Sequence, residues 1–315
     1  MWPVIRRFGL LALGVVALWL VTVLTLNLTV YSAGGFVMGY LRAMEEGNYT
    51  VAASRAGLGE APLVFPSAEE RISDPLILQT GSLPDGNIVV QASYSLDGET
   101  HQSLFVLTES EPTLWFFTNW RFAPAPLATL DVSVVGDNRV VINESELSVS
   151  RLGIPPRVRV LVPGVYDASL STDWVVAETA TQTVTEVGGS NPLRITLEPT
   201  DRLRDASTDA VEDFLDECAR QGVLQPAGCP FGVTIDDRII GSPEWSILDY
   251  PDVRLTLAGD RASWSLFARN GVAEVTTQVQ SLFDGSIEEV VEVVPFEVFG
   301  VVRGTLLDDP VLNLY

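Results

Sequence analysis

An uncharged, apolar run over residues 8–31 constrains the architecture of this chain more than any other feature. In a helix, about 24 residues reach about 36 Å, which is enough to cross a hydrocarbon core of about 30 Å. Arg6 and Arg7 precede the run, and the next basic residue is Arg42. By the positive-inside rule, residues 1–7 then lie in the cytoplasm. The sequence predicts a single transmembrane anchor over residues 8–32, with all later residues outside the cytoplasm.

A cleaved secretory signal is the alternative interpretation of the same run. Val30, Tyr31 and Ser32 offer a weak cleavage site. The apolar core of a signal peptide is about 7 to 15 residues long, which is shorter than this run, so the anchor is favoured. Under both interpretations the rest of the chain is exported from the cytoplasm.

Composition restricts the partners of the exported part. The formal net charge of the 315-residue chain is −22, and every one of its cationic side chains is an arginine. Such a charge repels phosphate backbones, so we expect no nucleic-acid partner. Arginine without lysine is typical of a GC-rich genome, which indicates a bacterial, actinobacterial origin. The expected partners are the lipid bilayer, through residues 8–32, and an unidentified envelope protein or cell-wall component.

Residues 34–126 have the pattern of a membrane-proximal α+β domain. Phe36, Tyr40, Leu41 and Met44 recur at helical spacing, and a second short helix is expected over residues 50–56. The stretch 57–84 is rich in Gly, Pro and Ser, so it is predicted to be irregular.

A β-hairpin is expected next within the same domain. β-rich runs at 88–95 and 101–108 flank Asp97-Gly98, a dipeptide that favours a tight hairpin turn. An aromatic strand is predicted over residues 114–122.

The remaining chain divides into two further predicted domains. Short β-rich runs separated by Gly, Pro and Asn indicate a small β-sandwich over residues 127–200. Residues 201–315 are predicted to form a second α+β domain, whose helix begins at Ser207 as N-cap. In this helix an apolar stripe includes Val211 and Leu215. The predicted fold class is therefore an N-terminal transmembrane α-helix followed by a β-rich ectodomain of two α+β domains around a β-sandwich.

Two segments resemble known families. Residues 36–54 resemble the first helices of NTF2-like or cystatin-like domains in actinobacterial membrane-anchored proteins. Residues 162–166, Val-Pro-Gly-Val-Tyr, resemble a turn of small β-sandwich modules in envelope proteins. The domain order is similar to that of TcaA-type envelope proteins, although the N-terminal zinc-ribbon cysteines of that family are missing here. The resemblance implies a single-pass envelope protein and assigns no functional residue.

Cys218 and Cys229 are the only cysteines. Two cysteines in an exported chain that close a loop of about ten residues are typical of a structural disulfide. A redox pair would favour C-x-x-C spacing, and a metal site would need further His or Cys nearby. We predict a disulfide that joins the end of the helix to the following strand.

Aromatic residues supply the candidate binding surfaces. Three candidate residues lie in the aromatic run of the first domain, and three lie in the last domain. Each of them is expected either to pack in a core or to contribute to a surface that binds a partner or a ligand. These candidates are Trp115, Phe117, Trp120, Trp245, Tyr250 and Trp264.

The sequence lacks an assembled catalytic pattern. His101 is the sole histidine, and the absence of lysine excludes Lys-based nucleophiles. No catalytic residue, cofactor or metal ligand is predicted. The expected function is a non-enzymatic, membrane-anchored binding or scaffolding protein of the bacterial cell envelope. The alternatives are a membrane-tethered hydrolase that uses carboxylates of the last domain, and an accessory subunit whose helix joins a larger membrane complex.

Overall fold

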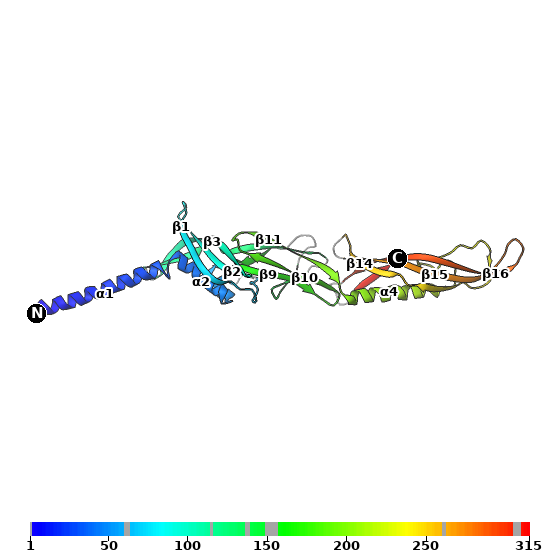
Figure 1. Ribbon diagram of the computed structural model, residues 1–315, viewed down its shortest axis with the longest axis horizontal. Coiled ribbons are helices and arrows are strands. Elements are labelled where there is room, and N and C mark those ends of the chain that lie inside the picture. Colours follow the sequence, from blue (N-terminus) through cyan, green and yellow to red (C-terminus); the bar gives the residue numbers. More distant parts are fainter. Residues whose placement is uncertain are drawn as a thin grey trace.

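The chain forms an elongated, β-rich structure with a few helices (Figure 1). The computed structural model describes residues 2–59, 64–113, 116–135, 139–148, 157–259, 263–304 and 310–315. Three β-sheets follow one another along the long axis, in the order of the sequence (Figure 1).

Helix α1, Trp2–Leu28, projects from one end of the molecule (Figure 1). Large apolar side chains along it, such as Leu18 and Leu28, are about 70% exposed. The described side chains of α1 are those of Leu13–Leu28. Among the residues whose side chains are described, no single helix is long and apolar enough to span a bilayer. Leu13–Leu28 and Ala33–Glu45, bent by 59° at the break between them, reach that length and composition only as a pair.

Helices α2, Ala33–Glu45, and α3, Tyr49–Arg55, follow α1. The predicted helical stripe of α2 is confirmed, because Tyr40, Leu41 and Met44 are buried. The Ser32 hydroxyl caps this helix by accepting a hydrogen bond from the Gly35 N–H, 3.0 Å away.

The first sheet has the strand order β1-β2-β3-β4, with all strands antiparallel. Its strands are β1 Ser73–Ser82, β2 Ile88–Leu96, β3 Glu99–Thr113 and β4 Phe117–Phe122. The prediction that residues 57–84 are irregular was wrong for β1. This strand pairs at the sheet edge through two register shifts, so its side chains show no regular alternation of burial.

The predicted hairpin between β2 and β3 is confirmed. Asp97 and Gly98 adopt positive φ angles of 52° and 72°, as the two central residues of a type I′ turn require. The turn fixes the register so that Tyr94 and Leu96 of β2 are buried in the same face.

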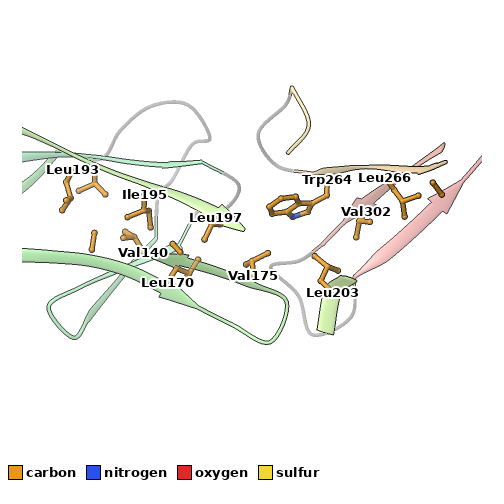
Figure 2. Close-up of a cluster of buried hydrophobic side chains, with 14 of the residues drawn as sticks. Val140, Leu170, Val175, Leu193, Ile195, Leu197, Leu203, Trp264, Leu266 and Val302 are labelled. Carbon is orange, nitrogen blue, oxygen red and sulfur yellow. The ribbon is translucent and has the colours of Figure 1, made fainter. Parts of the chain in front are cut away.

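The second sheet has seven strands in the order β7-β6-β9-β10-β11-β5-β8. Its strands are β5 Leu127–Val135, β6 Arg139–Ile142, β7 Ser145–Ser148, β8 Arg157–Leu161, β9 Gly164–Ser171, β10 Val175–Val184 and β11 Ser190–Pro199. Leu193 and Ile195 of β11 face Val140 and Leu170 across a buried layer (Figure 2). The sheet thus folds over its own core.

The third sheet is covered by α4, Asp201–Ala219. Its strands are β12 Arg238–Ile239, β13 Glu244–Asp249, β14 Asp252–Leu257, β15 Trp264–Gln280, β16 Ile287–Arg303 and β17 Val311–Leu314. The prediction of Ser207 as N-cap was wrong. Thr200 caps the helix, whereas Ser207 is buried about two turns later and donates its hydroxyl proton to the Leu203 carbonyl oxygen at 2.7 Å.

Strand β15 continues over 17 residues, through the turn-prone pair Asn270-Gly271. A register shift between Ala268 and Gly271 lets the strand bend without ending. Asn270 has a positive φ of 68° at this bulge. A Cβ atom on Gly271 would lie 2.4 Å from the ring of Phe296, so the close packing there requires glycine.

Shared cores connect the three sheets. Leu161 and Val165 of the second sheet pack in the core of the first. At the other junction, Leu197 and Val175 belong to the same buried cluster as Leu203 of α4 (Figure 2). The described units are therefore packed against one another rather than tethered by open linkers.

Candidate functional site

The side-chain amide of Asn27 ties the end of α1 to the first sheet. Its Nδ2 donates to the Phe116 carbonyl oxygen at 2.7 Å. Its Oδ1 accepts from the Thr118 N–H at 3.0 Å. The amide satisfies two backbone groups at the start of β4, in the way that a neighbouring strand would. We call this contact between α1 and β4 the helix clasp.

Aromatic side chains complete the helix clasp. Phe117 stacks on Tyr31 with ring centroids 4.3 Å apart, and the Trp120 Nε1–H donates to the Tyr31 carbonyl oxygen at 2.9 Å. Phe116 lies edge-on to Trp19, with centroids 5.4 Å apart. Trp19 lies nine residues before the end of α1, so this contact reaches about 14 Å back along the helix axis.

Two of the predicted surface aromatics are thereby placed. Phe117 and Trp120 are half-buried against the end of α1 rather than forming an open patch. Trp115 lies outside the described residues. The contact of Asn27 with β4 was not predicted from the sequence, although an isolated amide in an apolar run is a signal that could have indicated it.

The hydroxyl groups near the end of α1 are satisfied within the helix. Thr22, Thr25 and Thr29 each donate to the carbonyl oxygen four residues earlier, at 2.9, 2.8 and 2.7 Å. Together with the Asn27 bonds, these contacts leave the helix surface compatible with apolar surroundings.

The predicted disulfide is present between Cys218 and Cys229, with Cα atoms 5.7 Å apart. It joins the buried end of α4 to the segment that leads to Phe231. Gln221 braces the closed loop, since its side-chain oxygen accepts from the Ala227 N–H at 2.8 Å. In the part of the chain that the structure describes, no group of three or more His, Cys, Asp or Glu side chains is arranged to hold a metal ion.

The aromatic candidates of the last unit lie in different surroundings. Trp245 is buried against Phe231, and its Nε1–H donates to the Val223 carbonyl oxygen at 2.8 Å. Trp264 is buried at the junction with the second sheet (Figure 2). Tyr250 is 43% exposed and donates to the Asp216 carboxylate, a bond that raises the pKa of the phenol to about 12.

A depression of about 440 Å³ lies on the face of the third sheet away from α4. It is lined by Asp252, Arg254, Thr256, Phe267, Arg269 and Asn270. The Asn270 amide donates to Asp252 at 3.2 Å, so the one carboxylate in the lining already has a partner. A glycosidase-type mechanism needs two carboxylates facing one site, and this lining supplies one.

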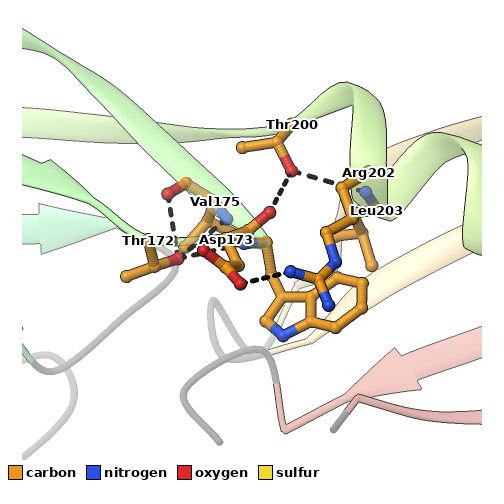
Figure 3. A network of polar contacts seen from close by, with 7 residues as sticks. Thr172, Asp173, Val175, Thr200, Arg202 and Leu203 are labelled. Atoms are coloured by element: carbon orange, nitrogen blue, oxygen red, sulfur yellow. Dashed lines mark hydrogen bonds and ion pairs between the residues drawn. The ribbon is translucent and has the colours of Figure 1, made fainter. Parts of the chain in front are cut away.

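The junction between the second and third sheets contains a compact polar network (Figure 3). The Arg202 guanidinium lies 4.5 Å from the centroid of the Trp174 ring and forms an ion pair with Asp173. The Thr200 hydroxyl donates to the Asp173 carbonyl oxygen at 2.7 Å while it caps α4. Because α4 begins directly after β11 ends at Pro199, these contacts fix the direction in which the chain leaves the second sheet.

In comparisons with protein-family models, curated proteins and solved structures, nothing matches this chain.

Proposed function

We propose that the chain is a single-pass membrane protein of the bacterial cell envelope, with a binding or scaffolding role and no catalytic activity. Residues 8–32 form its anchor, residues 1–7 lie in the cytoplasm, and the sheets lie outside. The carrying observation is that α1, apolar and exposed, projects from one end of the folded part, with the helix clasp at its base (Figure 1).

The energetics of α1 support the anchor. Large apolar side chains along α1 are exposed to solvent in the described structure, among them Leu13, Leu18, Leu24 and Leu28. Each would gain roughly 1.5 to 3 kcal/mol by transfer to an apolar environment. The Cys218–Cys229 disulfide fits the oxidising compartment that this topology requires.

The arrangement of the folded part supports a scaffold. We interpret the folded part as a β-sandwich between two NTF2-like α+β units. This is the domain order that resembles the TcaA-type envelope proteins. Packed junctions such as that of Arg202 with Trp174 favour a stiff connection. The β15–β16 hairpin lies at the end of the molecule opposite to α1 (Figure 1), so a stiff chain presents it away from the bilayer.

The mature N-terminus of the membrane-bound protein tests the anchor directly. Membranes from cells that produce the full chain are washed with alkaline carbonate, and the retained protein is analysed by intact mass. We expect a mass that includes residues 1–32. A polypeptide that begins after Ser32 and washes off the membrane would identify a cleaved signal instead.

An accessory-subunit role is the second candidate, and the surface of α1 favours it. A Cβ atom on Gly14 would meet nothing within 4 Å, so the described chain leaves room for another helix at this position. Gly14→Leu would fill that room. Loss of co-purifying membrane subunits in this variant, with retention in the membrane, supports the subunit role, and unchanged co-purification contradicts it.

The hydrolase alternative requires carboxylates of the last unit, and among the described residues Asp252 lines the depression of the third sheet. Asp252→Asn would abolish any glycan-hydrolysing activity of the purified full chain if that carboxylate were catalytic. We expect no such activity in either protein.

A further inference from the structure

Strand β16 has a long free edge. It pairs with β15 from Ile287 to Val302. On its other side, β17 pairs only with Gly300–Arg303, and Phe299 adds two hydrogen bonds to Tyr315. Among the described strands, none pairs with the outer edge of residues 287–298. An unpaired strand edge of this length exposes backbone N–H and C=O groups to which another strand can bind.

The pattern of pairing identifies which backbone groups point outward. The N–H and C=O of Phe299 both bond Tyr315, so they lie on the outer side of β16. In an antiparallel strand this direction repeats every second residue. The register shift at Ala268 and Gly271 places its extra residue in β15, so the alternation along β16 is uninterrupted. Glu289, Val291 and Val293 therefore direct their N–H and C=O groups to the free edge.

Pro295 fits this assignment. It falls in the same alternating set, so the N–H that proline lacks would have pointed outward, where no β15 bond needs it. Its ring interrupts the donor pattern on the edge. The stretch available for strand addition is therefore residues 287–293, which we call the free edge.

The side chains around the free edge combine apolar and acidic groups. Phe283 at the hairpin tip is fully exposed, and Ile287 and Val293 are more than half exposed. Glu288 and Glu292 are exposed on the opposite face of β16 from Val293. In the described part of the chain, no ion pair involves any carboxylate of the free edge.

We propose that the free edge binds an extended segment of a partner protein, which adds as a strand to β16 and carries Lys or Arg alternating with apolar residues. Backbone bonds to Glu289, Val291 and Val293 supply the ladder, and the basic side chains face Glu288 and Glu292. The inference deepens the proposed function and rests on it, because the anchored chain presents this hairpin at its far end.

Charge argues against a second copy of the chain as the occupant. Two copies pairing along the same stretch would place glutamates of one beside glutamates of the other, and like charges across a strand pair are destabilising. A basic segment removes this repulsion and is drawn to a chain of net charge −22.

The test uses the full chain in lipid nanodiscs and a labelled peptide, Val-Lys-Val-Lys-Val-Lys-Val. Two control peptides carry Glu in place of Lys, or N-methyl groups on alternate amides that block the ladder. We expect the first peptide to bind and to slow hydrogen exchange of the Val291 and Val293 amides at least ten-fold. Both controls bind at least ten-fold more weakly. Equal binding of the N-methylated peptide would overturn the proposal.

Variants of the chain locate the binding. Val291→Pro removes an outward N–H and should weaken binding at least ten-fold, while its circular dichroism melting curve shows that the sheet still folds. Glu288→Gln with Glu292→Gln should weaken binding several-fold. The matched control, Asp209→Asn with Glu212→Gln on the exposed face of α4, makes the same charge change and should leave affinity within two-fold.

Failure of the free-edge proposal can be distinguished from failure of the proposed membrane anchor. Unchanged affinity of Val291→Pro, or a dimer of the free chain that this substitution dissociates, overturns the peptide proposal. A chain retained in the membrane that does not bind the peptide contradicts the free-edge proposal alone. A chain that binds the peptide but begins after Ser32 contradicts the anchor alone.

Discussion

The side-chain N–H of Asn27 donates to the carbonyl oxygen of Phe116 at 2.7 Å, which joins the apolar helix to a strand 89 residues later. The side-chain oxygen of Asn27 also accepts from the Thr118 N–H, so this one residue satisfies two backbone groups at the start of β4. This contact sets the direction in which the folded part leaves α1.

Asn27→Ala should loosen the start of β4. Loss of two hydrogen bonds of about 1 kcal/mol each, about 2 kcal/mol in total, corresponds to an increase of roughly thirty-fold in local opening. Hydrogen exchange of the Thr118 amide in nanodiscs measures it. Asn313→Ala, an exposed amide in β17, is the control and should leave Thr118 unaffected. Equal exchange rates in wild type and Asn27→Ala would show that the helix clasp does not hold β4.

Removal of the disulfide should destabilise the third unit. Cys218→Ala with Cys229→Ala releases a loop closed over a sequence separation of 11, which corresponds to about 2 to 3 kcal/mol of unfolding free energy. Urea unfolding followed by tryptophan fluorescence measures the difference. Reduction of the wild type with dithiothreitol should have the same effect. A stability that neither change alters contradicts a structural role for the bond.

Leu203→Ala should weaken two units at once, because Leu203 is fully buried in the cluster that the second and third sheets share. Truncation of a buried leucine costs about 2 to 5 kcal/mol. We expect faster hydrogen exchange at Leu197 in β11 as well as in α4. Arg202→Ala is the matched control one position away, where an exposed ion pair and a cation–π contact contribute about 1 kcal/mol. An effect confined to α4 would show that the junction is not shared.

Stability should fall in alkaline solution because of Tyr40. Burial raises the pKa of this phenol above its usual value, and its hydroxyl donates to the Val162 carbonyl oxygen at 2.6 Å. The unfolded phenol ionises near pH 10, whereas the folded one stays neutral. The stabilisation is therefore full below pH 10 and is lost as the pH rises above it. Urea unfolding at pH 8, 10 and 11 measures the decline.

Tyr40→Phe separates the ionisation from general alkaline damage. The variant should be less stable than wild type at pH 8, because the Val162 carbonyl loses its donor. Its stability should decline less steeply above pH 10, since one buried phenol is gone. Parallel declines of the two proteins would exclude Tyr40 as a cause.

Local patterns predicted the elements that depend on neighbours in the sequence. The stripe of Tyr40, Leu41 and Met44 predicted α2, and Asp97-Gly98 predicted the β2–β3 turn. The pair Cys218 and Cys229 also lies within one short segment, so its bond was predictable.

Features that depend on distant contacts were not predictable. Strand β1 owes its existence to pairing with β2 through bulges, which leave no alternation in its sequence. The bonds from Asn27 to Phe116 and Thr118 join segments about ninety residues apart. Thr200, the cap of α4, also donates to the Asp173 carbonyl oxygen, a contact across 27 residues that exists only once the second sheet has folded.

The accessibility of the C-terminus in intact cells tests the central proposal most directly. An epitope tag after Tyr315 is probed with an antibody before and after permeabilisation, with a cytoplasmic protein as the control for leakage. A membrane-retained chain whose tag is labelled in intact cells is the expected result. A tag that is labelled only after permeabilisation would place the sheets on the cytoplasmic side and contradict the proposed topology.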